Sequence, residues 1–266
     1  MSVFATTEPG QAESAGLARR VAFAAQITAV SGFVDAVGAL HLLGLNVAFM
    51  SGNTTSFATA ILQGDRGLIL AGAAIIATFV AGAALATRLA LMIPARLLFL
   101  SIMGVEALLF AAALGLSGKV PDLVATLPLC FAMAIQNVLR DTVAGSEIGR
   151  TFVTGTLYSL GAGLARIRRR GNATKAGLAA LSWCSIVAGG AAGAAVMLRF
   201  GLEASLWTAL AILAAMTALH MVWPAPIPER APHHEDAARA GPSDGAALAG
   251  ATAGGPGEAG SSARSV

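Results

Sequence analysis

Eight apolar stretches, most of them nearly as long as a membrane is thick, follow one another between residues 21 and 224. A helix needs about 20 apolar residues to cross the hydrocarbon core of a bilayer. In lipid only helices and closed barrels satisfy the backbone, and these stretches lack the apolar-polar alternation of a barrel strand. The predicted fold class is therefore all-α, a polytopic transmembrane helical bundle. The stretches lie at about 21–43, 46–63, 68–91, 97–116, 122–139, 151–165, 176–198 and 203–223.

The shortage of charge supports a membrane location and argues against a soluble enzyme. Only 12% of the 266 residues are charged, whereas about 25% is usual in soluble domains. So few charges cannot cover a water-facing surface, and the lipid bilayer is the expected partner. The basic residues stand at the ends of apolar stretches, where membrane topology places them, so no nucleic-acid partner is expected.

Three regions follow from this pattern. Residues 1–20 form a polar N-terminal segment, and residues 21–224 form the transmembrane domain. Residues 225–266 are rich in Ala, Gly and Pro and have no large apolar residue after Ile227 except Leu248. Such a segment buries too little apolar surface to fold, so a disordered tail is predicted.

An internal repeat divides the transmembrane domain into halves of about 21–116 and 122–224. The segment Phe49-Met-Ser-Gly-Asn-Thr-Thr55 corresponds to Phe152-Val-Thr-Gly-Thr-Leu-Tyr158. Upstream, Asp35 corresponds to Asn137 when one gap is allowed. Each half thus contains one full stretch, one short stretch with a polar start and two full stretches.

The two short stretches decide how many times the chain crosses the membrane. The stretch 151–165 makes about 22 Å of helix, less than the hydrocarbon core of about 30 Å. If both short stretches are half-spanning, six full spans remain and the repeat is inverted, as in many secondary transporters. Both termini are then cytoplasmic, and every Lys and Arg except Arg66, Lys119 and Arg199 lies inside. Eight spans are the alternative, with a parallel repeat and more basic residues outside.

These motifs resemble the YoaK family of small bacterial integral membrane proteins. The resemblance rests on Gly32-Phe-Val-Asp35-Ala-Val-Gly38, Phe49–Thr55, Ile135-Gln-Asn137 and Thr151-Phe-Val-Thr-Gly-Thr156, and it covers about 20–224. It implies a multi-pass protein of the bacterial inner membrane with about six spans. It supplies no substrate and no catalytic residue.

Two acidic residues are predicted at mid-membrane depth, Asp35 in the first stretch and Glu106 in the fourth. A charge at this depth costs about 2.5–3.5 kcal/mol on insertion scales and usually faces the bundle interior or a water-filled cavity. We interpret both as candidate proton or cation sites. The alternative is a structural carboxylate satisfied by a neighbouring helix. If the two lie close together, one should carry a proton, because two like charges repel.

The starts of the two short stretches are the other candidate sites. Small polar residues there can bond the free N–H groups of a first helical turn, and those N–H groups favour an anionic group of a solute. A helix-to-helix turn without a ligand is an equally good interpretation. Gln136 and Asn137 either complete this site or only bond neighbouring helices. The candidates at the helix starts are Ser51, Gly52, Asn53 and Thr54 in the first half and Thr154, Gly155 and Thr156 in the second.

The functional hypothesis is a small secondary transporter or permease, coupled to protons through Asp35 and by extension Glu106. The alternatives are a non-transporting assembly or signalling protein and, third, a membrane-embedded enzyme. No enzyme, metal or cofactor motif is found in the sequence, so no enzymatic activity and no cofactor are expected. The expected partners are the bilayer and an unknown small solute, with a homo-oligomer left open.

Overall fold

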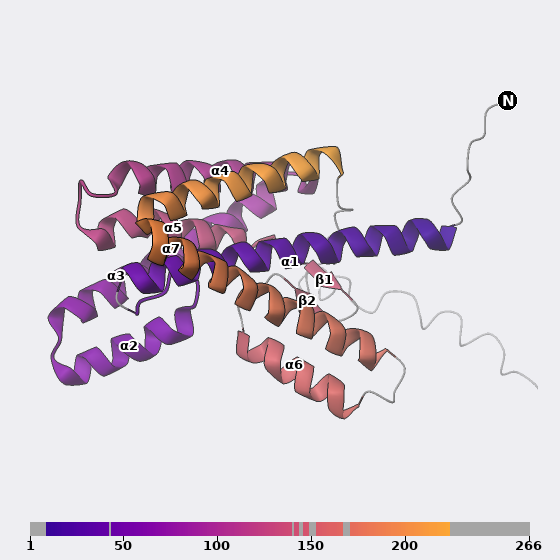
Figure 1. Ribbon diagram of the computed structural model, residues 1–266, viewed down its shortest axis with the longest axis horizontal. Helices are drawn as coiled ribbons and strands as arrows, with labels where there is room; N and C mark the ends of the chain where they lie inside the picture. The colour runs from indigo at the N-terminus through magenta and orange to yellow at the C-terminus, as the bar shows by residue number, and fades with distance from the viewer. Residues whose placement is uncertain are drawn as a thin grey trace, which may run out of the picture. The chain divides into compact units, whose positions relative to one another are not determined.

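The computed structural model describes residues 9–42, 44–139, 141–143, 146–148, 153–166 and 171–223. These parts of the chain form seven helices and one short two-stranded hairpin (Figure 1). The predicted all-α helical bundle is confirmed, and its helices are α1 (Pro9–His41), α2 (Met50–Gln63), α3 (Arg66–Met92), α4 (Ala95–Leu116), α5 (Asp122–Gln136), α6 (Val153–Ala165) and α7 (Asn172–Val222). The tail 225–266, predicted to be disordered, lies outside the described residues, as do Thr151 and Phe152.

Four of the described helices are long and apolar enough to cross a membrane. They are α1 from Gly16 onward, α3, α4 from Leu97 onward, and α7. The helix α5 has 15 residues and ends at Gln136, earlier than the predicted stretch 122–139. The number of crossings therefore remains a prediction.

The long helix α7 is bent at Gly201, between the predicted stretches 176–198 and 203–223. Gly201 has φ 80° and ψ −175°, a conformation that is essentially restricted to glycine. Figure 1 shows the two parts of α7 diverging from this bend, the first lying beside α6 and the second beside α4. A second short feature was not predicted: β1 (Asp141–Val143) pairs antiparallel with β2 (Ser146–Ile148) in the connection between α5 and α6.

Glycine contacts bring α1 and α7 close together. A Cβ atom at Gly189 or Gly193 would collide with the main chain of Ala29 or Phe33, respectively. Small residues at such positions let two helix backbones approach closely in lipid. Gly189 and Gly193 thus allow α7 to pack closely on α1. Beside this contact lies the bundle core, in which the largest fully buried side chains include Val34, Ile102, Phe110 and Leu129.

The short helices α2 and α6 both begin near the middle of the bundle and run to opposite ends (Figure 1). They have 14 and 13 residues, so each is too short to cross the hydrocarbon core of about 30 Å. In the figure, the turn between α2 and α3, the turn between α4 and α5 and the bend of α7 lie at one end, whereas α6 leads into α7 at the other.

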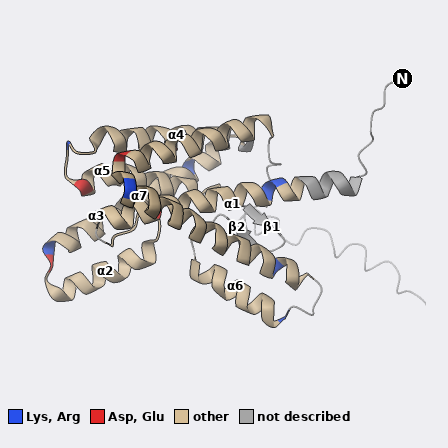
Figure 2. Cartoon of the chain, viewed as in Figure 1, with Lys and Arg blue, Asp and Glu red and all other residues tan. Residues whose placement is uncertain are grey.

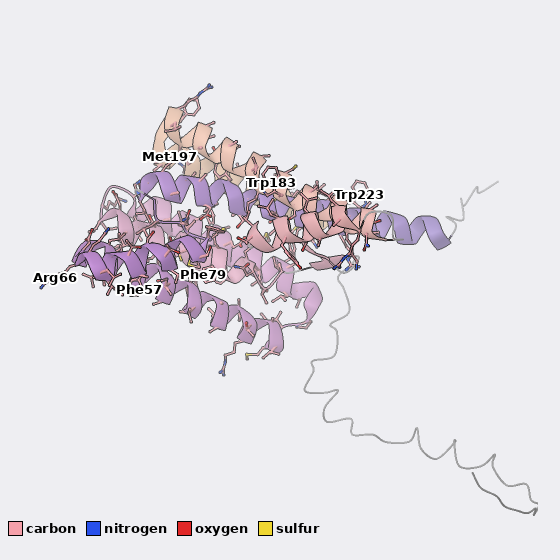
Figure 3. All side chains as sticks on the ribbon, turned by 90° about the horizontal axis from the view of Figure 1, so that it is seen from below. Phe57, Arg66, Phe79, Trp183, Met197 and Trp223 are labelled. Atoms are coloured by element: carbon pink, nitrogen blue, oxygen red, sulfur yellow. The ribbon has the colours of Figure 1, made fainter. Side chains whose placement is uncertain are left out.

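Most of the charged residues that Figure 2 colours lie toward the ends of the helices, and long stretches between them carry no charge. In Figure 3, Arg66 at the start of α3 and Trp223 after α7 lie toward opposite ends of the bundle. At the end of α1, His41 Nε2 lies 3.5 Å from Asp122 Oδ1 at the start of α5. This distance suits an ion pair when the imidazole is protonated, although the nitrogen makes no hydrogen bond.

Candidate functional site: a hollow at the start of two half-spanning helices

The Asp35 carboxylate of α1 holds the chain that leads into α2. Its Oδ1 atom accepts hydrogen bonds from the main-chain N–H groups of Val47 and Ala48, both at 2.9 Å, and of Phe49 at 3.3 Å. Phe49 is the N-cap residue of α2. The first N–H groups of a helix and of the turn before it lack partners within the helix. A side chain from another helix thus holds the three residues that lead into α2, whereas the N-cap residue Phe49 offers no side-chain cap of its own.

A glycine lets this segment lie against α1. A Cβ atom at Gly38 would come within 2.8 Å of Val47 Cγ1. Gly38 is three residues after Asp35, so the two share one face of α1. The segment can therefore approach the helix at Gly38 and present its N–H groups to the carboxylate one turn earlier.

The Asn53 side chain, from within α2, also holds the segment that leads into this helix. Its Oδ1 accepts from the Asn46 N–H at 2.8 Å, and its Nδ2 donates to the Asn46 carbonyl at 2.6 Å. Asn53 is fully buried. Both of its polar ends are thus used by the protein itself, and Asn53 is a structural bracket in this state rather than a group open to a solute.

Beside Asp35 the surface is hollowed by a cavity of about 380 Å³. It opens between α1, the segment before α2, the start of α6 and the middle of α7. Its polar residues are Asp35, which is half-buried, and Asn46. Within the described chain, Asp35 Oδ2 has no hydrogen-bond partner. The residues that line the hollow are Gly32, Asp35, Ala36, Ala39, Asn46, Phe49, Val153, Ile186 and Val187.

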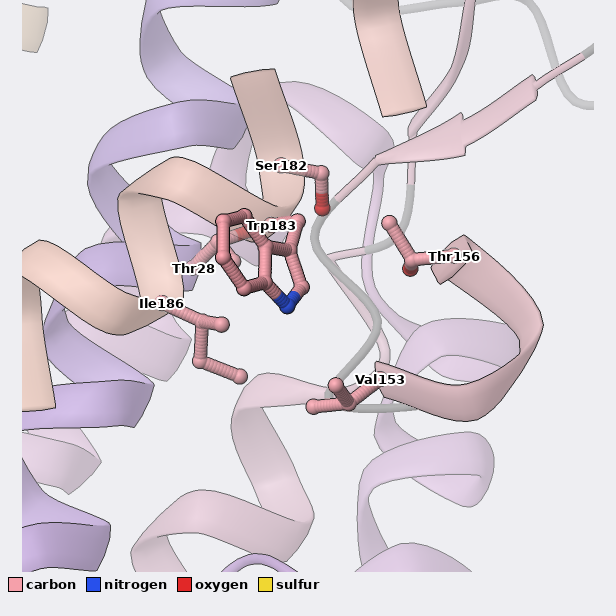
Figure 4. Close-up of a pocket in the computed structure, with 6 residues that line it drawn as sticks. All are labelled: Thr28, Val153, Thr156, Ser182, Trp183 and Ile186. Carbon is pink, nitrogen blue, oxygen red and sulfur yellow. The ribbon is translucent and has the colours of Figure 1, made fainter. Parts of the chain in front are cut away.

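A second, much narrower hollow lies beside the first. The two share Val153 of α6 and Ile186 of α7. Figure 4 shows the hydroxyl groups of Thr156 and Ser182 facing the same space, next to Trp183. The space leaves no room for a water molecule, so the structure is closed at this point.

The sequence of this chain matches the pattern of a protein family over residues 23–219. That family is described as proteins of unknown function, DUF1275. The chain belongs to the DUF1275 family. It is also 35% identical, over 189 residues, to the UPF0700 transmembrane protein RA0705 of Rhizobium meliloti (strain 1021). The matched region is 70% of this chain and 80% of the relative. No solved structure matches the chain.

The other predicted carboxylate of this DUF1275 protein, Glu106, is separate from the hollow. Glu106 is fully buried in α4 and accepts a hydrogen bond from Gln136 Nε2 at 3.4 Å. Its second oxygen, Oε1, is buried and has no hydrogen-bond partner among the described residues. Neither Glu106 nor Gln136 lines the Asp35 hollow. The predicted pairing of Gln136 between helices is confirmed, and its partner is Glu106.

The remaining candidates of the DUF1275 chain lie around these contacts. Asn137 is the C-cap residue of α5 and donates to the Met133 carbonyl at 3.0 Å, among other interactions. The exposed Thr54 donates to the Met50 carbonyl at 2.9 Å. Gly52 lies under the Asn46 side chain, since a Cβ atom there would come within 3.1 Å of Asn46 Nδ2. Of the other helix-start candidates, Thr156 lines the narrow hollow, whereas Ser51, Thr154 and Gly155 line neither one.

Sequence reasoning missed several residues of the site. Asn46 is the first residue of the predicted stretch 46–63, and a polar residue at the start of a short apolar stretch could have indicated a site residue. Thr28 and Ser182 are single hydroxyl residues inside long apolar helices, where they are common without any function. Ile186 and Val187 carry no signal at all, because they are ordinary apolar residues of a membrane helix.

Proposed function

We propose that this DUF1275 protein is a proton-coupled secondary transporter or permease of a small solute, with the Asp35 hollow as its central site. The observation that carries the proposal is that Phe49, the N-cap of α2, and Val153, the first residue of α6, line the same hollow as Asp35. Broken helices that start at a common central site are the usual construction of secondary-transporter sites.

Reciprocal helix contacts support an inverted repeat as part of this proposal. Gly189 in α7 packs against Ala29 in α1. In the same way, a Cβ atom at Gly82 in α3 would come within 2.8 Å of Ala134 Cβ in α5. Under the repeat alignment α1 corresponds to α5 and α3 to the first part of α7. The opening helix of each half thus packs, through a glycine, on the third helix of the other half.

The shared wall of the two hollows suggests where the barrier to the solute lies. From the Asp35 hollow to the narrow hollow, the lining moves back along α1 from Asp35 to Thr28 and back along α7 from Ile186 to Ser182. It moves forward along α6, from Val153 to Thr156. All three changes lead toward the same end of the bundle, the end at which α6 connects to α7. A step back along α1 or α7 and a step forward along α6 have this direction in common, because α6 runs opposite to α1 and to the first part of α7. We propose that Val153 and Ile186 close the path at this point.

Transport is tested by reconstituting the purified full chain in liposomes that contain a pH-sensitive dye. We expect an imposed pH gradient to be dissipated when the right solute is added, and we expect the Asp35→Asn variant to remove this effect. A screened solute that moves equally well through wild type and Asp35→Asn would contradict proton coupling at Asp35. We place the protein in the inner membrane with both termini cytoplasmic, as the charge distribution indicates.

A non-transporting assembly protein remains the second candidate, because the hollow opens at the surface and is lined on α1 by Gly32, Ala36 and Ala39. Such a groove of small residues also suits a helix of a partner. Crosslinking from a cysteine at Ala39 to another protein, without any solute flux, would favour it. An enzymatic role has less support, because the described contacts of His41 and His220 are with Asp122 and with Phe23 and Phe99.

A further inference from the structure

The polar groups of the hollow restrict the charge of its ligand. The sequence suggested that the N–H groups at the start of α2 would receive an anionic group of a solute. In the structure Asp35 Oδ1 already occupies the N–H groups of Val47, Ala48 and Phe49. The N–H groups of the segment that leads into α2 are therefore already satisfied by a carboxylate of the protein.

The groups that a ligand would meet in the hollow are mainly a carboxylate and apolar side chains. Asp35 Oδ2 has no hydrogen-bond partner within the described chain, and among the described residues that line the hollow there is no Lys, Arg or His. A helix N-terminus carries only about half a positive charge, which is less than the full charge of the carboxylate. Phe49 adds an aromatic ring to the wall, and Val153, Ile186 and Val187 complete it.

We propose that the hollow binds the ammonium group of a small organic solute against Asp35 Oδ2, a substrate class that rests on the function proposed above. A carboxylate neutralises the ammonium charge, an aromatic face attracts it, and apolar walls accept its carbon substituents. The volume of about 380 Å³ lies within the usual range of about 300–1,000 Å³ for ligand sites. An ammonium group and a proton compete for the same carboxylate, so one replaces the other without a change in net charge.

Competition makes ligand binding depend on pH. The ammonium group needs the ionised form of Asp35, so its apparent affinity falls as the pH is lowered and protons occupy the carboxylate. The described lining residues, which come from α1, α6, α7 and the segment before α2, add no other titratable group. On α5, Cys130 lies within electrostatic reach of Asp35. Its thiol, however, donates a hydrogen bond to the Ile75 carbonyl at 3.4 Å.

Binding is tested by thermal unfolding of the purified full chain in detergent, with salts added at equal ionic strength. The probes are methylammonium chloride and tetramethylammonium chloride, with sodium chloride as the reference, sodium propionate as an anion and alanine as a zwitterion. We expect the ammonium salts to raise Tm above the sodium chloride reference, and to raise it more at pH 8 than at pH 5. Stabilisation by alanine as well would identify the ammonium group of a zwitterion as the ligand group.

Two variants and a matched control identify the site. Asp35→Asn keeps an oxygen that can accept the N–H groups but removes the charge, and should weaken tetramethylammonium binding about tenfold or more. Phe49→Leu should weaken it about threefold. Asp65→Asn, at the exposed N-cap of α3, should leave it unchanged.

The opposite results separate this inference from the function on which it rests. Stabilisation by propionate alone, or equal stabilisation of wild type and Asp35→Asn by ammonium salts, would overturn the ammonium site, while transport of another solute could still be found. Ammonium binding with the expected pH dependence, but without flux in liposomes, would support the site and contradict transport.

Discussion

The Asn53 side chain forms two hydrogen bonds with the main chain of Asn46, one to the N–H group and one to the carbonyl. Asn53→Ala leaves both groups without their partner, at about 1–3 kcal/mol for each buried group. We expect a loss of about 2–4 kcal/mol in the free energy of unfolding, measured by SDS titration in mixed micelles. Thr54→Ala, at the next and exposed position, should change it by less than about 0.5 kcal/mol. Equal effects of the two substitutions on the free energy of unfolding would show that the two hydrogen bonds between Asn53 and Asn46 do not stabilise the fold.

The hydrogen bonds of Asp35 predict an order of stability for two substitutions. Asp35→Ala removes the acceptor of three N–H groups and should lower the free energy of unfolding by about 2–4 kcal/mol. Asp35→Asn retains a side-chain oxygen and also removes a charge that is costly to keep out of water, so its loss should be at most about 1 kcal/mol. The same SDS titration measures both. If Asp35→Asn were as damaging as Asp35→Ala, the negative charge itself would hold the fold.

The glycine contact between α1 and α7 predicts opposite effects at two glycines of one helix. Gly193→Ala places a Cβ atom against the main chain of Phe33, and overpacking of this kind costs about 1–3 kcal/mol. Gly177 has open space around it, so Gly177→Ala should be neutral or stabilising by up to about 1 kcal/mol. Thermal unfolding of both variants in detergent tests this. A harmless Gly193→Ala would show that the two helices can separate slightly.

Membrane topology is predicted from the distribution of charge and is tested by cysteine labelling. In a background with Cys130 and Cys184 replaced by Ala, Arg66→Cys and Arg88→Cys place single thiols at two exposed positions of α3. Six spans predict that an impermeant maleimide added to intact cells modifies the thiol at 66 and leaves the one at 88 unmodified until the cells are opened. Eight spans predict the reverse.

The proposed barrier predicts that a residue of the narrow hollow becomes reactive when the shared wall is trimmed. In the same cysteine-free background, Ser182→Cys should react slowly with a methanethiosulfonate reagent, because Ser182 is only 3% exposed. Adding Val153→Ala and Ile186→Ala should increase the labelling rate about tenfold or more, since the side chains that separate the two hollows are shortened. An unchanged rate would place the barrier elsewhere.

Local patterns predicted the helices and much of what positions the site. Apolar stretches located the helices, the short length of two of them predicted half-spanning helices, and the depth of Asp35 predicted its importance. Hydrogen-bond partners were not predictable, because they join residues far apart in the sequence. The partner of Glu106 is Gln136, 30 residues later, and no periodicity encodes that distance. Of the candidates at the start of α2, the Asn53 side chain is already bound to the main chain of Asn46 in this state of the protein, and solute binding by the first-turn N–H groups stays a prediction.

The two oxygens of Asp35 belong to one rigid carboxyl group, of which Oδ1 holds the segment that leads into α2 and Oδ2 has no hydrogen-bond partner within the described chain. Rotation of that group toward a guest draws Oδ1 away from the N–H groups of Val47, Ala48 and Phe49. Ligand binding in the hollow and the attachment of the segment before α2 therefore depend on the same bond, the one about which the Asp35 carboxyl group rotates.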